Sequence, residues 1–115
     1  MYRAPLLVLA VLSLPSAAHS ADRKGTRFWN LTQYTIVTLQ LSPAGQDSWG
    51  HDQCENDRDH EVDHDERLRI TDVAPGRYDV RLKDKTGRVC VVKNIEVKDG
   101  DIFTIEEKDL AGCTG

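Results

Sequence analysis

Short segments in which apolar and polar residues alternate are the feature of this sequence that most limits its possible folds. In residues 35–41, Val37, Leu39 and Leu41 share one face, and residues 78–83 alternate in the same way. Because successive side chains of a strand point to opposite faces, this pattern predicts half-buried β-strands. Downstream of residue 20, no segment keeps a helical period over more than about two turns. We therefore expect an all-β chain.

The expected strands are short and are separated by turn-forming sequences. They cover residues 27–32, 35–41, 68–73, 78–83, 89–97 and 102–106, the fifth being one strand or a pair. Ser42-Pro43-Ala44-Gly45 and Asp84-Lys85-Thr86-Gly87 have typical turn compositions. About six or seven strands at this spacing predict a small antiparallel β-sandwich, Ig-like or transthyretin-like.

The first twenty residues predict a secretory signal peptide. Arg3 precedes an apolar run, residues 6–14, and small residues follow at 16–21. This run is too short to span a bilayer as a permanent helix. We expect cleavage after Ser20, or alternatively after Ala18. The remaining chain would be secreted or periplasmic, without a membrane anchor.

Three cysteines, Cys54, Cys90 and Cys113, lie in residues 21–115, which we expect to form a single domain. In an oxidising compartment a disulfide is the default for two of them. Three pairings are possible, and we favour Cys90 with Cys113. Cys90 lies in an expected strand, and Cys113 lies in a polar tail that would otherwise fray. Cys54 would then be a free thiol, a metal ligand, an intermolecular link or a buried residue.

An acidic loop, residues 51–66, carries the strongest functional signal. Every odd position from 55 to 65 is a carboxylate. Such groups repel one another unless a cation, a basic partner or water separates them. Hard cations such as Ca²⁺ take roughly six to eight oxygen ligands. The candidate ligands are Asp57, Asp59, Glu61, Asp63 and Asp65.

Two other interpretations of the acidic loop remain open. It is either the solvated loop of a structural or interaction domain, or a Zn²⁺ site built from His51, Cys54, His60 and His64. His60 and His64 are four residues apart and would share one face of a helical turn. Zn²⁺ favours nitrogen and thiolate ligands, but the spacing from Cys54 matches no familiar zinc signature.

The distribution of charge and the sequence context of the serines argue against two classes of function, nucleic-acid binding and catalysis by a serine nucleophile. Removing residues 1–20, which contain one charged residue, Arg3, changes the net charge from −4 to −5. The basic residues alternate with carboxylates along the sequence instead of forming one stripe, which argues against nucleic-acid binding. Ser42 and Ser48 lie in no nucleophile-elbow context. We expect a non-enzymatic exported binding module that engages a hard cation or a basic partner.

Several short motifs resemble a family of small exported bacterial proteins. They are Asn30-Leu31-Thr32, Leu41-Ser42-Pro43-Ala44-Gly45, Trp49-Gly50 and Tyr78-Asp79-Val80-Arg81, and together they span most of residues 28–92. The resemblance implies a small extracytoplasmic β domain and no reaction. The chain departs from the family pattern at Gln33-Tyr34 and in its long acidic loop. The hairpin that begins at Pro75-Gly76 is also similar to transthyretin-like and carboxypeptidase-regulatory-like modules, which supports the fold only.

Two further expectations concern single residues. We expect Trp49 to close one end of the sandwich, because a large aromatic residue in a small domain usually serves its core. Asn30-Leu31-Thr32 has the form of a glycosylation site. In a bacterial product we expect Asn30 and Thr32 instead to satisfy backbone groups at the end of a strand.

Overall fold

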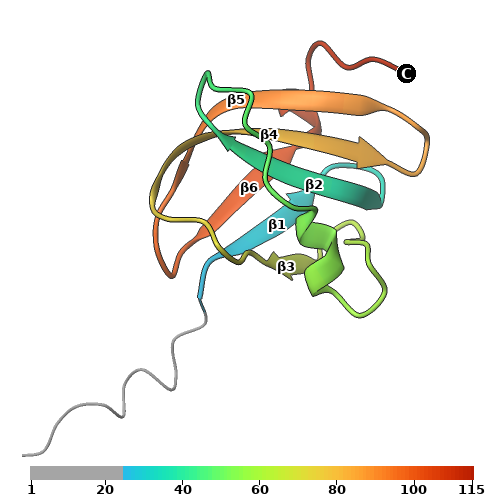
Figure 1. Ribbon diagram of the computed structural model, residues 1–115. Helices are drawn as coiled ribbons and strands as arrows, with labels where there is room; N and C mark the ends of the chain where they lie inside the picture. The colour runs from blue at the N-terminus through green and yellow to red at the C-terminus, as the bar shows by residue number, and fades with distance from the viewer. Residues whose placement is uncertain (1–24) are drawn as a thin grey trace, which may run out of the picture.

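The structure of the protein, a computed structural model, describes residues 25–115 and consists of two stacked β-sheets (Figure 1). Its strands are β1 (Arg27–Leu31), β2 (Ile36–Pro43), β3 (Arg67–Arg69), β4 (Gly76–Asp84), β5 (Val89–Val97) and β6 (Ile102–Glu106). Within residues 25–115 the only helical segments are two 3-10 turns, η2 (Gln53–Asn56) and η3 (Glu107–Asp109). The predicted all-β sandwich is confirmed. The predicted signal peptide lies outside the described residues.

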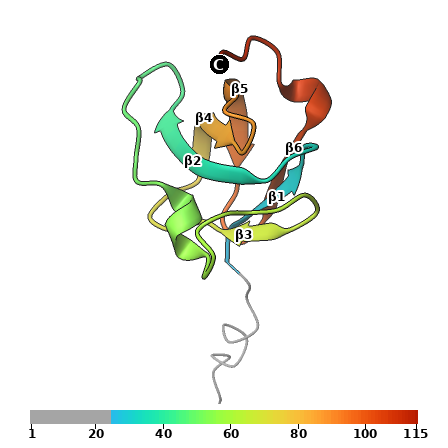
Figure 2. The same cartoon turned by 90° about the vertical axis from the view of Figure 1, so that its right-hand side faces the viewer.

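Each layer has three strands, in the orders β3-β1-β6 and β2-β4-β5 (Figure 2). Three of the four strand pairs are antiparallel, as expected, but β1 and β6 run parallel. The chain returns from β5 in the other sheet before it enters β6. As a result, β1 and β6 start at the same end of their sheet. There the backbone N–H of Arg27 donates to the carbonyl oxygen of Asp101 at 3.0 Å.

The inward face of β2 differs from the one that simple alternation predicts. Ile36 and Leu39 are fully buried, whereas Val37 is only half-buried. A β-bulge between Ile36 and Thr38 changes the register against β4. An extra residue in one strand shifts the alternation, so the side chains that precede it point to the opposite face of the sheet from the one expected. The prediction that Val37 shares the face of Leu39 and Leu41 is therefore wrong, and Ile36 takes its place.

The hydrophobic core lies between the two sheets and also includes part of the acidic loop. Its buried members are Phe28, Ile36, Leu39, Leu41, Cys54, Val62, Leu68, Ile70, Val80, Leu82, Cys90, Val97, Phe103 and Ile105. Trp49 is not among them. It is half-buried, and the guanidinium carbon of Arg81 lies 4.4 Å from its ring centre. Arg81 faces outward from β4, so Trp49 lies outside the sandwich, and the expectation that it closes one end is wrong.

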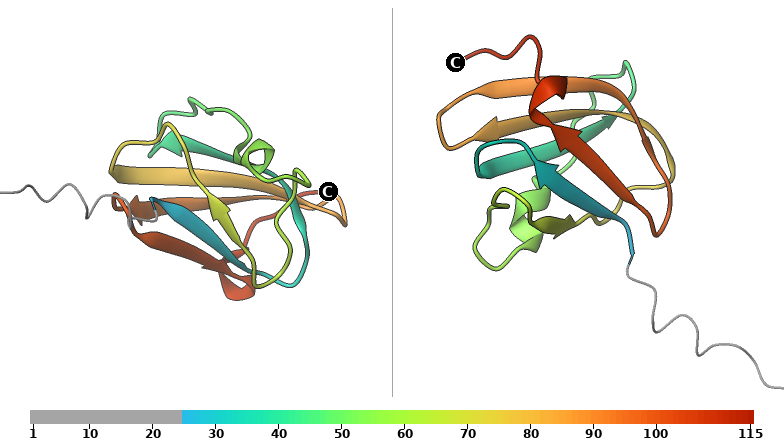
Figure 3. Two further views of the ribbon diagram at one scale, coloured as in Figure 1. Left: turned by 90° about the horizontal axis from the view of Figure 1, so that it is seen from below. Right: turned by 180° about the vertical axis from the view of Figure 1, so that it is seen from behind.

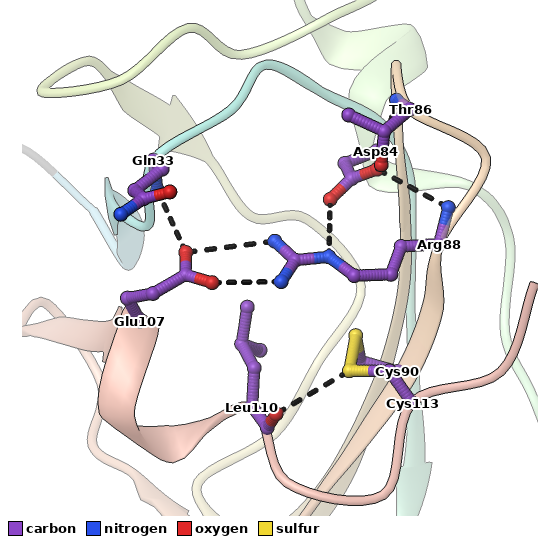
Figure 4. Close-up of a disulfide and its surroundings, with 8 residues drawn as sticks. All are labelled: Gln33, Asp84, Thr86, Arg88, Cys90, Glu107, Leu110 and Cys113. Atoms are coloured by element: carbon purple, nitrogen blue, oxygen red, sulfur yellow. Dashed lines mark hydrogen bonds and ion pairs between the residues drawn. A yellow bond between two sulfur atoms is a disulfide. The ribbon is translucent and has the colours of Figure 1, made fainter.

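The C-terminal tail is fastened to β5 by a disulfide between Cys90 and Cys113, with an S–S distance of 2.03 Å (Figure 4). The predicted pairing is confirmed and is consistent with an oxidising compartment. A short backbone pairing between Val89 and Thr114 extends the attachment. No helix of residues 25–115 is long and apolar enough to cross a membrane.

Beside the disulfide, Arg88 joins two carboxylates, Asp84 at the end of β4 and Glu107 in η3, the turn that follows β6 (Figure 4). Its Nε donates to Asp84 at 2.9 Å and its Nη1 to Glu107 at 2.7 Å. Hydrogen bonds from Arg88 and from the Gln33 backbone lower the pKa of Glu107. Burial alone would raise the pKa of Asp84, but hydrogen bonds from Thr86 and Arg88 outweigh burial and lower it. Through these two ion pairs, Arg88 links the end of β4 in one sheet to the turn that follows β6 of the other sheet.

Candidate functional site

The acidic loop, residues 51–66, packs on the domain through buried side chains. Cys54 is fully buried and Val62 is only 1 % exposed. Val62 also pairs with Ile36 through two backbone hydrogen bonds, each 2.9 Å long. The loop closes over the end of the sandwich between β2 and β3, as the green and yellow-green ribbon shows in Figures 1 and 2. Two of its residues thus belong to the core, and its path is set by the fold.

Asn30 ties the acidic loop to β1. This side chain is fully buried, and its Nδ2 donates to the carbonyl oxygens of Val62 and Tyr34, both at 3.0 Å. Its Oδ1 accepts from the backbone N–H of Thr32 at 2.9 Å and from the Thr32 hydroxyl at 2.7 Å. The expectation that Asn30 and Thr32 satisfy backbone groups is confirmed. Because its side chain is fully buried, Asn30 is not accessible to glycosylation in the folded protein.

The backbone of the acidic loop turns repeatedly, so its carboxylates do not share one face. It contains η2 and two further turns, at residues 58–59 and 64–65. His60 and Asp65 adopt positive φ angles of 59° and 69°, which reverse the chain direction. Alternate residues share a face only in extended backbone. The spacing of the carboxylates in the sequence therefore does not carry over into space.

Four of the five candidate calcium ligands instead interact with separate groups of the protein. Asp57 accepts from the backbone N–H of Asp59 at 2.9 Å. Asp63 accepts from the Thr35 hydroxyl at 2.8 Å, and Asp65 from Trp29 Nε1 at 3.0 Å. Glu61 forms an ion pair with Lys85 at 3.3 Å.

Asp59, the fifth candidate, is exposed. In the part of the chain that the structure describes, no group of three or more His, Cys, Asp or Glu side chains is placed to hold a metal ion.

The alternative zinc ligands are likewise placed apart. His64 Nδ1 donates to the carbonyl oxygen of Thr32 at 2.6 Å, and His51 Nε2 lies 3.3 Å from the Thr71 hydroxyl. His60 is exposed. The Cys54 thiol is the free cysteine, and its Sγ donates to the carbonyl oxygen of Ile36 at 3.7 Å. Burial, reinforced by Asp52, raises the pKa of Cys54 far above its usual range, which disfavours the thiolate that a metal requires.

The acidic loop still presents charge to solvent. Glu55 and Asp59 are exposed, and neither side chain has a hydrogen-bond or ion-pair partner within residues 25–115. Asp63, Asp65 and Glu66 are exposed as well, although each accepts one hydrogen bond. Chemically, this arrangement offers separate acceptors on a fixed backbone. It suits one-to-one contacts with lysine or arginine side chains.

Sequence reasoning missed a second group of charged residues on the outer face of the sheet β3-β1-β6. Arg67 and Arg69 of β3 face outward there together with Arg27 and Trp29 of β1. A signal was available in the alternation Arg67-Leu68-Arg69 and Arg27-Phe28-Trp29, where a buried residue separates two outward ones. Only the pairing of β1 with β3 shows that both pairs lie on one surface.

Comparisons of this chain with models of protein families, with curated proteins and with solved structures gave no significant match.

Proposed function

We propose that this protein is an exported, non-enzymatic binding module whose acidic loop, residues 51–66, engages a basic surface of a partner protein. The observation that carries the proposal is that the loop is anchored through Cys54 and Val62 while five of its eight carboxylates are exposed. A fixed backbone reduces the entropy that is lost when the carboxylates pair with a partner.

The distribution of the carboxylates favours a basic protein surface over a single hard cation. A Ca²⁺ ion needs several oxygens converging on one point. Asp57, Asp63 and Asp65 are instead directed at donors on different segments. A surface of lysine and arginine side chains makes no such demand, because each side chain meets one carboxylate. Complementary charge would then mainly accelerate encounter and set orientation.

Export is supported by two independent features. The first twenty residues have the layout of a signal peptide. The Cys90–Cys113 disulfide fits an oxidising compartment.

Binding of a labelled octalysine peptide, followed by fluorescence anisotropy, tests the proposal. The informative variant is Glu55→Gln with Asp59→Asn, because these side chains are exposed and have no partner in the described part of the chain. Its matched control is Glu96→Gln with Asp99→Asn, which removes the same charge from exposed positions elsewhere. Two exposed charge pairs contribute about 0.5 to 2 kcal/mol, so the first variant should bind about 2- to 30-fold more weakly.

Equal weakening in both variants would show attraction to net charge alone and would reject the acidic loop as the site. Calorimetric titration with Ca²⁺ provides the second arm. Saturable heat at millimolar Ca²⁺ that is lost in the Asp59→Asn variant would replace the basic partner with a hard cation.

A further inference from the structure

Three arginines gather on the outer face of the sheet β3-β1-β6, the sheet that lies in front in the right-hand view of Figure 3. In the antiparallel pairing of β1 with β3, Arg27 is opposite Arg69 and Trp29 is opposite Arg67. The residue pair between them, Phe28 with Leu68, faces the core. Arg27, Arg67 and Arg69 therefore form one surface, which we call the arginine face.

The arginine face has no ion-pair partner of the kind that Arg88 has. Among residues 25–115, none of these three arginines forms an ion pair, whereas Arg88 forms one with Asp84 and one with Glu107. The Nε of Arg27 is shielded from solvent and has no hydrogen-bond acceptor. Like charges directly opposite on paired strands destabilise a sheet. This arrangement costs stability in the free protein, and a bound anion would relieve it.

Trp29 holds one of the three guanidinium groups in place. The guanidinium carbon of Arg67 lies 4.1 Å from the Trp29 ring centre. The Nε1 of Trp29 donates to Asp65, which fixes the ring. Stacking uses the flat face of a guanidinium and leaves its N–H edges available as donors. Arg67 is therefore oriented before any ligand arrives.

Two carboxylates border the arginine face, and each already contacts another group of the protein. Asp65 is engaged with Trp29, and Glu106, on the neighbouring strand β6, lies 3.8 Å from Lys108. The other outward residues of β6 on this face are Ile102 and Thr104, which are uncharged.

We propose that the arginine face binds a ligand that carries several phosphate groups. The planar fork of arginine matches the oxygens of phosphate in a bidentate way. Arg67 and Arg69 are two residues apart, or about 6.5 Å at the usual strand rise, so the face offers separate positions to neighbouring phosphates. The acidic loop and the arginine face carry opposite charge, so this site takes a different ligand from the one proposed for the acidic loop.

Two probes distinguish a soluble from a membrane source of phosphate. Calorimetric titration of the disulfide-bonded protein with sodium tripolyphosphate tests the first. Cosedimentation with vesicles of phosphatidylglycerol and phosphatidylcholine tests the second. We expect saturable binding to at least one probe. The Arg67→Gln, Arg69→Gln variant should bind that probe at least tenfold more weakly.

The matched control is Lys83→Gln with Lys93→Gln, which removes two exposed positive charges from the other sheet. We expect its affinity to stay within twofold of the unchanged protein. Without ligand, the single variant Arg69→Gln should melt at the same temperature or higher, because it relieves the repulsion opposite Arg27 and leaves Arg67 stacked on Trp29. If the double variant does not fold, Arg69→Gln alone carries the test, because that side chain is exposed. No saturable binding to either probe, or equal weakening in both variants, would overturn the proposal.

Discussion

Replacing Asn30 by Ala should be among the most damaging single changes outside the apolar core. The Asn30 side chain is fully buried and makes four hydrogen bonds that join β1, the following turn and the acidic loop. In the Ala variant, the Val62 carbonyl oxygen keeps the Ile36 N–H, and the Tyr34 carbonyl oxygen keeps the Thr32 hydroxyl. Only the backbone N–H of Thr32 loses its acceptor.

The cost follows from this accounting. A buried donor without an acceptor costs about 1 to 3 kcal/mol, and each other lost hydrogen bond costs about 0.5 to 1.5 kcal/mol net. One orphaned donor and three other lost hydrogen bonds together should lower the free energy of unfolding by about 2.5 to 7.5 kcal/mol. That is a large share of the roughly 5 to 15 kcal/mol that is typical of a domain.

Thr32→Val is the matched control for this experiment. It removes the hydroxyl from the same network, yet Asn30 Oδ1 keeps the Thr32 N–H and the Tyr34 carbonyl oxygen keeps Asn30 Nδ2. No group is orphaned, so we expect a loss of only about 1 kcal/mol. Urea unfolding of both variants, with unchanged slope, measures the difference. An Asn30→Ala loss no larger than that of Thr32→Val would refute the reasoning.

Three further outcomes are expected. Reducing the Cys90–Cys113 disulfide, whose cysteines are 23 residues apart, should lower the free energy of unfolding by about 3 kcal/mol, and urea unfolding with and without reductant measures it. Cys54 should react with a thiol reagent only after denaturant is added, because it is fully buried and its pKa is raised; rapid labelling of the native protein would contradict this. Hydrogen bonds from the backbone N–H groups of Gly45 and Asn94 lower the folded-state pKa of Asp79 below its usual 3.8. The ionised Asp79 side chain therefore contributes its full stabilisation above pH 3.8, and this stabilisation is lost as the pH falls through the folded-state pKa. Between about pH 2 and 6, the melting temperature of the Asp79→Asn variant should depend less on pH than that of the unchanged protein.

Much of the fold could be predicted from the sequence because the determining interactions are local. Alternation in residues 80–83 placed β4, since the facing of a strand residue depends on its immediate neighbours. The alternation fails at Asp79, which was expected to face outward but is buried where β4 shifts register against β5. Compositions such as Asp84-Lys85-Thr86-Gly87 marked the ends of strands, and Gly87 does adopt a positive φ of 91°. The pairing of Cys90 with Cys113 followed from one expected strand and one polar tail.

Only the tertiary structure decided the properties that depend on pairing between distant segments. The bulge that exchanged Val37 for Ile36 arises from the register of β2 against β4. Carboxylates at alternate positions of the acidic loop became separate acceptors because Cys54 and Val62 draw the loop onto the core and force it to turn. The arginine face exists because β3 pairs with β1. A sequence shows which residues alternate along one strand, but packing of the whole domain fixes which strand lies beside it. Both the acidic loop and the arginine face depend on such contacts between distant segments.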